Sequence, residues 1–189
     1  MKIDYVNLST QYKLERFKLI QLIDKTLMSG LHVGGNEILK FEKKIAKLCN
    51  TKYAVAVNSG TDALTLALHL AGVRKGDEVI TVPNSFIATT AVIIHLGAKP
   101  VFVDVKDDQN INENLIEQKI TNKTKAIMPV HLGGRMCNMK KILSISKKYK
   151  IPIIEDCAQS ILSKYDKRLS GSWGDVGCFS THPLKNLNA

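Results

Sequence analysis

Residues 76–104 read GDEVITVPNSFIATTAVIIHLGAKPVFVD. The run at 78–82 is short, apolar and rich in β-branched residues, the segment at 85–96 has apolar residues at helical spacing, and 100–103 is again a short apolar run. A strand, helix, strand order of this kind forms a right-handed crossover between parallel strands, and strands covered on both faces are nearly continuous apolar runs. This stretch therefore predicts a parallel sheet with helices on its faces.

The same alternation extends to both sides of that stretch. Further strands are predicted at 53–57, 125–130 and 151–155, and further helices at 61–71, near 112–119 and at 138–149. Residues 163–180 have a different pattern, with a turn at Asp166-Lys167 and three glycines, which predicts short strands. The predicted fold class is α/β, a three-layer sandwich with a mostly parallel sheet.

Two helices are predicted ahead of the sheet. Apolar residues at helical spacing run up to Gly30, and a second such series follows a plausible cap at Asn36, so residues 1–50 form an N-terminal helical segment. No internal repeat, low-complexity tract or linker divides residues 1–189, which predicts one continuous unit.

The composition is that of a globular chain with a buried core. The 189 residues are 44% hydrophobic and 23% charged, which excludes a disordered tail. No apolar run approaches the roughly 20 residues of a membrane helix, and the first ten residues lack the layout of a signal peptide, so we expect a cytoplasmic protein with no membrane partner. The four cysteines form no Cys-x-x-Cys pair, so reduced thiols are expected, with no metal site and no disulfide framework.

The formal net charge is +10, from 27 basic and 17 acidic residues. Such an excess can attract polyanions. The basic residues, however, are mostly lysines scattered in pairs, with few arginines and little aromatic interleaving, whereas readers of nucleic acid use arginines and stacking aromatics. We therefore expect no nucleic-acid partner.

Ligands of a parallel α/β sheet bind beyond the carboxyl ends of its strands. The first such position is Asn58-Ser-Gly-Thr-Asp62, where Gly60 allows close approach, Ser59 and Thr61 offer hydroxyls, and the next helix offers free N–H groups. This combination suits a phosphate, although a simple helix N-cap uses the same residue types. No Gly-x-Gly-x-x-Gly or Gly-x-x-x-x-Gly-Lys pattern supports a dinucleotide or P-loop site.

Two further positions lie near the end of the chain. Asp156 follows the apolar strand at 151–155, where its carboxylate either caps the next turn or faces a positively charged ligand group. Lys185 follows Ser180 in a loop, and a lone lysine is usually a solvated surface charge. Together, however, a phosphate cradle, an acid and an amine are what a pyridoxal phosphate (PLP) enzyme requires. The amine forms a Schiff base with the aldehyde, and the acid keeps the pyridine nitrogen protonated.

Several motifs occur in a fixed order along the whole chain. They include Tyr53-Ala-Val-Ala-Val-Asn-Ser-Gly-Thr-Asp-Ala-Leu64, Gly97-Ala-Lys-Pro-Val-Phe-Val-Asp104, Glu155-Asp-Cys-Ala-Gln159, Gly174-Asp-Val-Gly-Cys-Phe-Ser180 and His182-Pro-Leu-Lys-Asn-Leu187. In this order they resemble the DegT/DnrJ/EryC1/StrS sugar aminotransferases, which belong to the fold type I PLP enzymes. The resemblance implies that PLP is the cofactor.

The resemblance implies a role for each matching position. Lys185 would be the catalytic lysine that forms the Schiff base and moves the proton between the substrate carbon and the cofactor. The implied cofactor-binding residues are Gly60, Thr61 and Ser180 at the phosphate, Asp156 at the pyridine nitrogen, Gln159 at the phenolic oxygen, Phe86 on the ring face, and Lys185 itself. Phe86 is equally interpreted as a core aromatic, and His131, His182 and Trp173 lie near the implied site without an assigned role.

The implied reaction moves an amino group from glutamate or glutamine to a nucleotide-linked keto-sugar, in the biosynthesis of amino sugars and surface polysaccharides, by a homodimer. Some relatives are dehydratases that have lost the lysine, so Lys185 favours transamination. Family members are roughly twice as long, so residues 1–189 correspond to an N-terminal part of an incomplete large PLP-binding domain, and the small C-terminal domain is absent. The alternative is a noncatalytic remnant or assembly module of the same fold.

Overall fold

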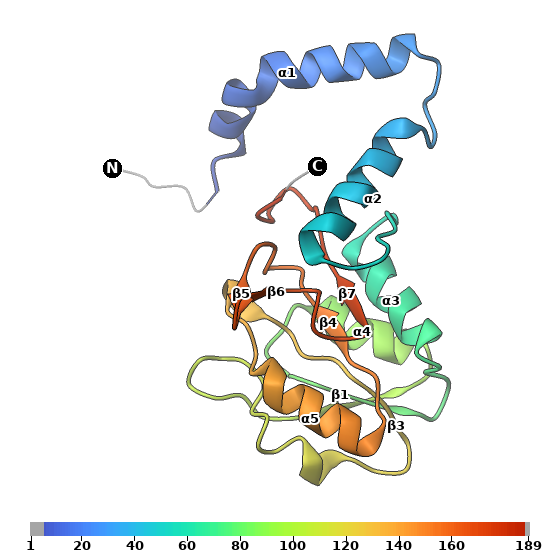
Figure 1. Cartoon of the computed structure of the whole chain (residues 1–189), viewed down its shortest axis with the longest axis vertical. Coiled ribbons are helices and arrows are strands. Elements are labelled where there is room, and N and C mark those ends of the chain that lie inside the picture. The colour runs from blue at the N-terminus through green and yellow to red at the C-terminus, as the bar shows by residue number, and fades with distance from the viewer. Residues whose placement is uncertain (1–5, 188–189) are drawn as a thin grey trace. The chain divides into compact units, whose positions relative to one another are not determined.

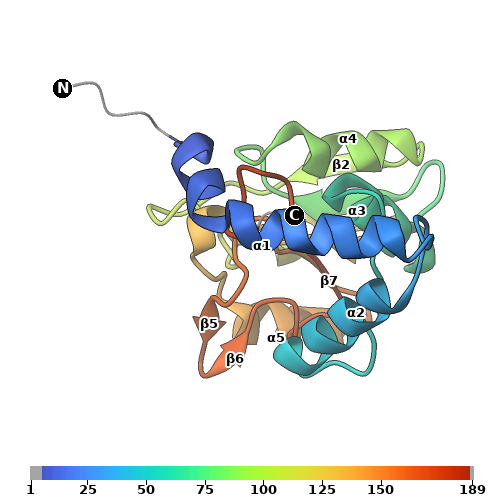
Figure 2. The ribbon, with the colours of Figure 1, turned by 90° about the horizontal axis from the view of Figure 1, so that it is seen from above.

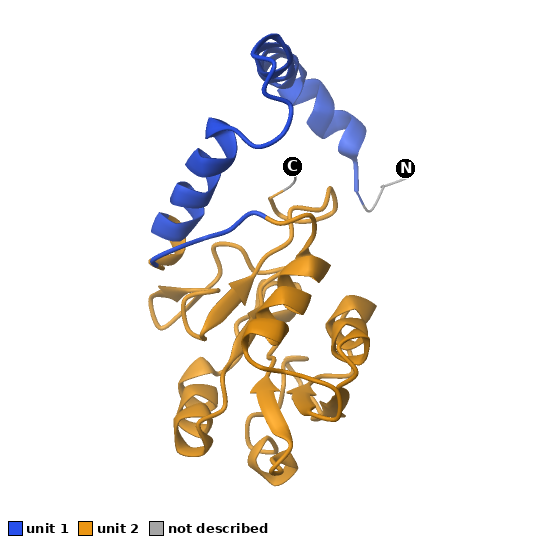
Figure 3. Cartoon of the chain, turned by 90° about the vertical axis from the view of Figure 1, so that its right-hand side faces the viewer, with its two compact units in different colours: residues 1–47, 52–56 blue, residues 48–51, 57–189 orange. Residues whose placement is uncertain are grey.

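The computed structural model describes residues 6–187 and divides into two compact units. The first, the helical unit, comprises residues 1–47 and 52–56, and the second, the sheet unit, comprises residues 48–51 and 57–189 (Figure 3). Each unit is described by itself.

The helical unit contains the two helices predicted at the start of the chain (Figure 1). Helix α1 spans Leu8–Met28, and α2 spans Asn36–Cys49. The side chain of Asn7 caps α1 by accepting a hydrogen bond of 3.0 Å from the Thr10 N–H. No residue of α1 is buried. Within residues 6–187, no helix combines the length and apolar character that crossing a bilayer requires.

The strand predicted at residues 53–57 is wrong. None of these residues is in a strand, and no strand of the described chain pairs with them. The Ala56 N–H instead donates to the Glu42 carboxylate at 2.9 Å. Tyr53 and Val55 are 73% and 76% exposed. An apolar run forms a strand only where a neighbouring strand provides its hydrogen-bond partners. Here the Glu42 side chain accepts the Ala56 hydrogen bond that a carbonyl of a neighbouring strand would accept.

The centre of the sheet unit is a parallel arrangement of three strands. Strand β1 (Glu78–Thr81) lies between β2 (Lys99–Phe102) and β3 (Thr124–Ile127), and both pairings are parallel. These strands confirm the predictions at 78–82, 100–103 and 125–130, with ends that differ by one to three residues.

Two more parallel strands continue this arrangement. Strand β4 (Ile154–Asp156) pairs with β7 (Val176–Cys178), and parallel bridges from Ile127 to Ile153 and from Val130 to Asp156 link the β3 segment to the β4 segment. The resulting order β2, β1, β3, β4, β7 is the mostly parallel sheet that the sequence predicts.

A small hairpin lies between β4 and β7 along the chain. Its strands are β5 (Lys164–Tyr165) and β6 (Arg168–Leu169), which are antiparallel. The turn between them has positive φ angles of 46° at Asp166 and 66° at Lys167, as a two-residue hairpin turn requires. The predicted turn and short strands are therefore confirmed.

Helices cover both faces of the sheet (Figure 2). Helices α3 (Gly60–Leu70) and α4 (Ile87–His95) bury their apolar residues with Val79, whereas α5 (Met139–Tyr149) packs in a second cluster with the adjacent Ile80. Successive strand residues point to opposite faces, so the two clusters are the two faces of one sheet. The three-layer α/β sandwich is confirmed.

The helix predicted near residues 112–119 is wrong in extent, because only a 3-10 turn, Glu117–Lys119, forms there. The Asn112 side chain accepts a hydrogen bond of 3.1 Å from the Asn114 N–H. Asn side chains that bond nearby backbone groups in this way compete with helix formation. The four cysteines are free and buried.

Candidate active site

Asp156, the last residue of β4, lies at the carboxyl edge of the sheet and is 4% exposed. Its carboxylate is held by two donors: the Thr89 hydroxyl donates to Oδ2 at 2.9 Å, and the Ala158 N–H donates to Oδ1 at 3.1 Å. Within residues 6–187, Oδ1 and Oδ2 of Asp156 each accept one hydrogen bond. Each oxygen therefore keeps capacity for one more donor.

The electrostatic surroundings of Asp156 favour a positively charged neighbour. Burial raises the pKa of Asp156 above its usual value, because the charged form loses its hydration. The two hydrogen bonds, and the positive charge of Lys185, act to lower this pKa. A buried carboxylate of this kind is stabilised by a cation that reaches it.

Lys185 is close enough to Asp156 for its charge to act on that carboxylate. The loop that carries it is held by its own hydrogen bonds. The Lys185 N–H donates to the His182 carbonyl at 2.8 Å, and the Leu184 N–H donates to His182 Nδ1 at 3.2 Å. Lys185 is half-buried rather than a freely solvated surface lysine.

The N-terminus of α3 and Ser180 lie against each other. A Cβ atom on Gly60 would come within 3.0 Å of the Ser180 Cβ and within 3.2 Å of the Phe179 carbonyl oxygen. Ser59 caps the helix, because its Oγ accepts from the Asp62 N–H at 3.0 Å. The helix itself does not use the N–H groups of Gly60 and Thr61. These two N–H groups and the Ser180 hydroxyl are donors from which an anion could accept hydrogen bonds; we call them the cradle.

Gln159 follows Asp156 by three residues, and its side-chain amide has a fixed orientation. The Gly133 N–H donates to Gln159 Oε1 at 2.7 Å. Because a backbone N–H can donate only to the oxygen of the amide, the NH₂ group is directed elsewhere and can donate. An oxygen with negative charge is therefore a suitable partner for Gln159.

Phe86 is the residue just before α4, and its ring is 67% exposed. The prediction left open whether this ring belongs to a core or to a site. Within residues 6–187 this side chain is not packed in a core, so its ring could stack on a ligand.

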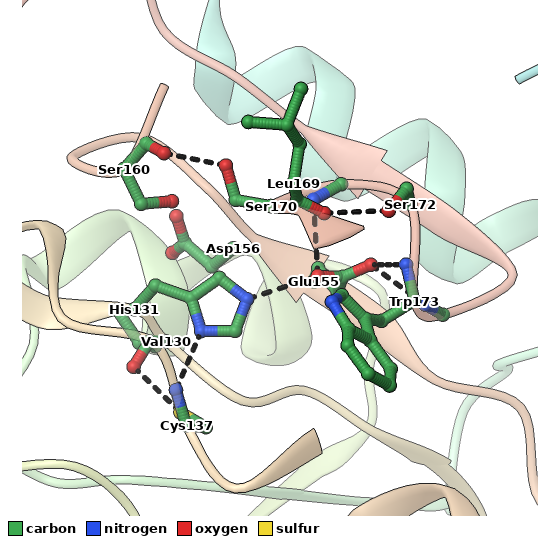
Figure 4. A network of polar contacts seen from close by, with 12 residues as sticks. Val130, His131, Cys137, Glu155, Asp156, Ser160, Leu169, Ser170, Ser172 and Trp173 are labelled. Atoms are coloured by element: carbon green, nitrogen blue, oxygen red, sulfur yellow. Dashed lines mark hydrogen bonds and ion pairs between the residues drawn. The ribbon is translucent and has the colours of Figure 1, made fainter. Parts of the chain in front are cut away.

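Behind Asp156, a network of polar contacts fixes the sheet edge (Figure 4). Glu155 is completely buried, and its carboxylate accepts hydrogen bonds from His131 Nε2 at 3.0 Å and from the N–H groups of Gly171, Trp173 and Gly174 at 2.7–3.0 Å. Although burial opposes it, the hydrogen bonds from His131 and these N–H groups hold the pKa of Glu155 below its usual value. Glu155 is therefore an ionised anchor for residues 171–174, the loop that leads into β7.

The network also fixes His131, whose Nδ1 accepts from the Cys137 N–H at 3.2 Å. Nε2 therefore carries the proton that is donated to Glu155. His131, Glu155 and Cys157 have possible metal-ligand atoms within 4.8 Å of one another. In the described chain, however, the histidine nitrogens and the Glu155 oxygens are already used in hydrogen bonds, and burial raises the pKa of the Cys157 thiol well above its usual value. This cluster is a structural network.

Sequence reasoning missed Thr89, its neighbour Ser85, and the anchoring role of Glu155. Thr89 is 1% exposed, and its hydroxyl lies 2.7 Å from that of Ser85. The usable signals were a charged residue inside a buried apolar strand, which needs donors, and hydroxyl residues close to the beginning of a helix at the sheet edge. His131 and Trp173, which had no assigned role, both belong to the Glu155 network.

These features define a class of protein. A parallel sheet between helices, with a buried acid, a lysine and a helix N-terminus at its carboxyl edge, is the large-domain architecture of the fold type I PLP enzymes. The family model of the DegT/DnrJ/EryC1/StrS aminotransferase family matches residues 14–189, so the chain belongs to this family.

Two curated relatives illustrate the similarity. The chain is 43% identical to the spore coat polysaccharide biosynthesis protein SpsC of Bacillus subtilis, over 89% of this chain and 43% of the relative. It is 41% identical to the UDP-N-acetyl-3-dehydro-alpha-D-glucosamine 3-aminotransferase of Acidithiobacillus ferrooxidans, over 99% of this chain and 51% of the relative. The chain spans about half the length of the curated relatives it matches.

Solved structures share the fold. DesV of S. venezuelae, in complex with a ketimine intermediate, superimposes with a TM-score of 0.94 at 35% identity, over 99% of this chain and 51% of that chain. NtdA of Bacillus subtilis, with bound cofactor PMP (the amino form of PLP), gives a TM-score of 0.86 at 34% identity, over 92% of this chain and 39% of that chain. The family prediction and the fold prediction are confirmed.

Proposed function

We propose that this chain is the PLP-binding part of an aminotransferase that moves an amino group from glutamate or glutamine to a nucleotide-linked keto-sugar. One observation carries the proposal. The buried carboxylate of Asp156, which has the charge of Lys185 nearby, lies at the same sheet edge as the N-terminus of α3. The family and the nucleotide-sugar substrate of the Acidithiobacillus relative support the reaction class.

The residues present fit PLP group by group. Asp156 is a buried acid with an unused lone pair on each oxygen, as a protonated pyridine nitrogen requires. A Cβ on Gly60 would be crowded against Ser180, and the two residues offer N–H and O–H donors that suit a phosphate. Gln159 has a free NH₂ group, which suits a phenolic oxygen that carries negative charge.

Each side chain then has a defined task. When bound, PLP supplies an electron-accepting ring that stabilises negative charge on the carbon that loses its proton. Asp156 holds a proton on the pyridine nitrogen, and Gly60, Thr61 and Ser180 bind the phosphate. Phe86 covers the ring face and excludes water from it. Lys185 forms the covalent attachment through Nζ and, when released, moves a proton at that nitrogen.

Titration of the purified chain with PLP tests the proposal. We expect saturable binding with a visible absorption band, and loss of that band on addition of glutamate together with formation of an equivalent amount of 2-oxoglutarate. Aspartate at the same concentration is the matched control, because a donor-specific site distinguishes the two acids. Absence of a saturable band would contradict the proposal.

The alternative of a noncatalytic remnant or assembly module predicts a different result from the same titration. A module of that kind would give either no band, or a saturable band that both glutamate and glutamine leave unchanged, with no 2-oxo acid formed. The two functions are therefore separated by the second step of the experiment.

A further inference from the structure

Thr89 connects the beginning of α4 with the acid at the end of β4, two elements far apart along the chain. Its hydroxyl donates to Asp156 Oδ2 at 2.9 Å, and its N–H donates to the Phe86 carbonyl at 3.0 Å. The residue is 1% exposed. One buried residue thus joins the backbone carbonyl of Phe86 to the buried carboxylate of Asp156.

The hydrogen bonds among Ser85, Thr89 and Asp156 have one consistent direction. An ionised carboxylate only accepts, so the single hydroxyl proton of Thr89 is directed to Asp156. The Thr89 oxygen, which lies 2.7 Å from the Ser85 oxygen, must then accept the proton of the Ser85 hydroxyl. The result is a chain of donors from Ser85 to Thr89 to Asp156.

We propose that Thr89, supported by Ser85, is a positioning residue that orients the Asp156 carboxylate toward the pyridine nitrogen of PLP. Ala158 holds Oδ1 through the backbone, so the Thr89 hydroxyl is the side-chain contact that fixes the rotation of the carboxylate about its own axis. This inference rests on the proposed function. It adds a residue whose side chain does not need to touch the cofactor.

The chemistry of this hydrogen bond predicts how much PLP affinity is lost when the Thr89 hydroxyl is removed. A hydrogen bond to a charged, buried group is lost completely when the donor is replaced by a methyl group, because no water reaches the orphaned oxygen. Valine has nearly the shape of threonine, so Thr89→Val removes the donor and keeps the packing. We expect PLP to bind about tenfold to a hundredfold more weakly to this variant.

A second readout does not need the cofactor. Without PLP, the carboxyl carbon of Asp156 can be followed by NMR as the pH is changed. Loss of the Thr89 donor removes a contact that favours the charged form, so the titration midpoint of this carboxyl should rise by about one pH unit. The other titratable groups around Asp156 are Lys185, His131, Glu155, Cys157 and Cys178, and the substitution changes none of them.

Two matched variants serve as controls. Thr89→Ser keeps the hydroxyl. Thr90→Val removes the hydroxyl of the next residue in α4, which is not one of the two donors to Asp156. We expect Thr89→Ser to restore both readouts to near the wild-type values and Thr90→Val to leave them unchanged. Thermal unfolding of all variants without PLP reports any loss of folding separately.

Three results would overturn the inference in different ways. If wild type binds PLP and Thr89→Val binds it equally well, Thr89 does not position Asp156 and the proposed function stands. If wild type itself gives no saturable PLP binding, the proposed function fails and the inference fails with it. Weaker binding of Thr89→Val that Thr89→Ser does not rescue would also contradict a role for the hydroxyl.

Discussion

Replacing Lys185 by alanine should abolish the transfer of the glutamate amino group to PLP, with a loss of about a thousandfold or more in rate. Two functions disappear together, because the same nitrogen forms the covalent attachment and moves the proton. The cradle at Gly60 and Ser180 and the acid at Asp156 remain, so PLP should still bind, but without the visible band of its covalent attachment. Rapid-quench measurement of 2-oxoglutarate gives the rate.

Lys164→Ala is the matched control for this substitution. Lys164 is an exposed lysine in β5 of the same unit, so its loss should leave the rate unchanged. A Lys185→Ala chain that produced 2-oxoglutarate at the wild-type rate would remove Lys185 from the reaction. A visible band that persisted in this variant would contradict its covalent role.

Replacing Glu155 by alanine should destabilise the sheet unit by about 3–5 kcal/mol. The substitution removes a buried carboxylate and leaves His131 Nε2 and the N–H groups of Gly171, Trp173 and Gly174 without their acceptor. Water cannot replace the lost acceptor at a site that is fully buried. Such a loss is a large fraction of the roughly 5–15 kcal/mol that stabilises a typical domain. Urea denaturation followed by circular dichroism measures it.

The sign of the pH dependence follows from the lowered pKa of Glu155. A carboxyl group whose pKa is lower in the folded state stabilises the fold above its usual pKa, and this contribution is lost as the pH falls through the folded value. The difference between wild type and Glu155→Ala should therefore be full at neutral pH and should shrink below about pH 4.5. Glu117→Ala is the control, because the Glu117 side chain is 38% exposed and its ion pair with Lys148 lies at the surface, where such pairs contribute little. Equal stability of wild type and Glu155→Ala at pH 7 would contradict the anchoring role.

Much of the sheet unit could be predicted from the sequence, because its strands are buried on both faces. Residues 79–82 and 100–103 are short runs that are mostly apolar, and the helix between them has apolar spacing with a period near 3.6, so the two types of element are easy to distinguish. Asn138, a residue type that commonly caps helices, caps α5, because its Oδ1 accepts a hydrogen bond from the Lys141 N–H. These are local rules that the tertiary structure does not override.

The strand and the helix that were predicted wrongly share a physical cause, because both depend on contacts with residues far away in the sequence. Residues 53–57 have strand composition, but no described strand pairs with them. Residues 112–119 have helical spacing, but the side chains of Asn112 and Glu113 bond to other groups, Glu113 to Lys106 and Asn138. The local sequence shows neither the absence of a neighbouring strand at 53–57 nor the distant contacts of Glu113.

The candidate site could be predicted only in part for a similar reason. Asp156, Gln159 and Lys185 lie within motifs that resemble the family, so their positions were available from the sequence. Thr89 and Asp156 are separated by 67 residues, and their contact depends on how α4 packs against the edge of the sheet. A hydroxyl residue near the beginning of a helix marks a candidate donor, but it does not show which carboxylate that donor contacts.

The central claim is that Lys185 is the lysine that binds PLP, opposite the acid Asp156. The most direct test is to reduce the PLP-loaded chain with borohydride, which fixes the cofactor on the lysine it occupies, and to map the modified peptide by mass spectrometry. We predict one cofactor per chain, on Lys185, with much lower labelling of Asp156→Ala under the same conditions. Labelling concentrated on another lysine, with Lys185 unmodified, would contradict this account of the site.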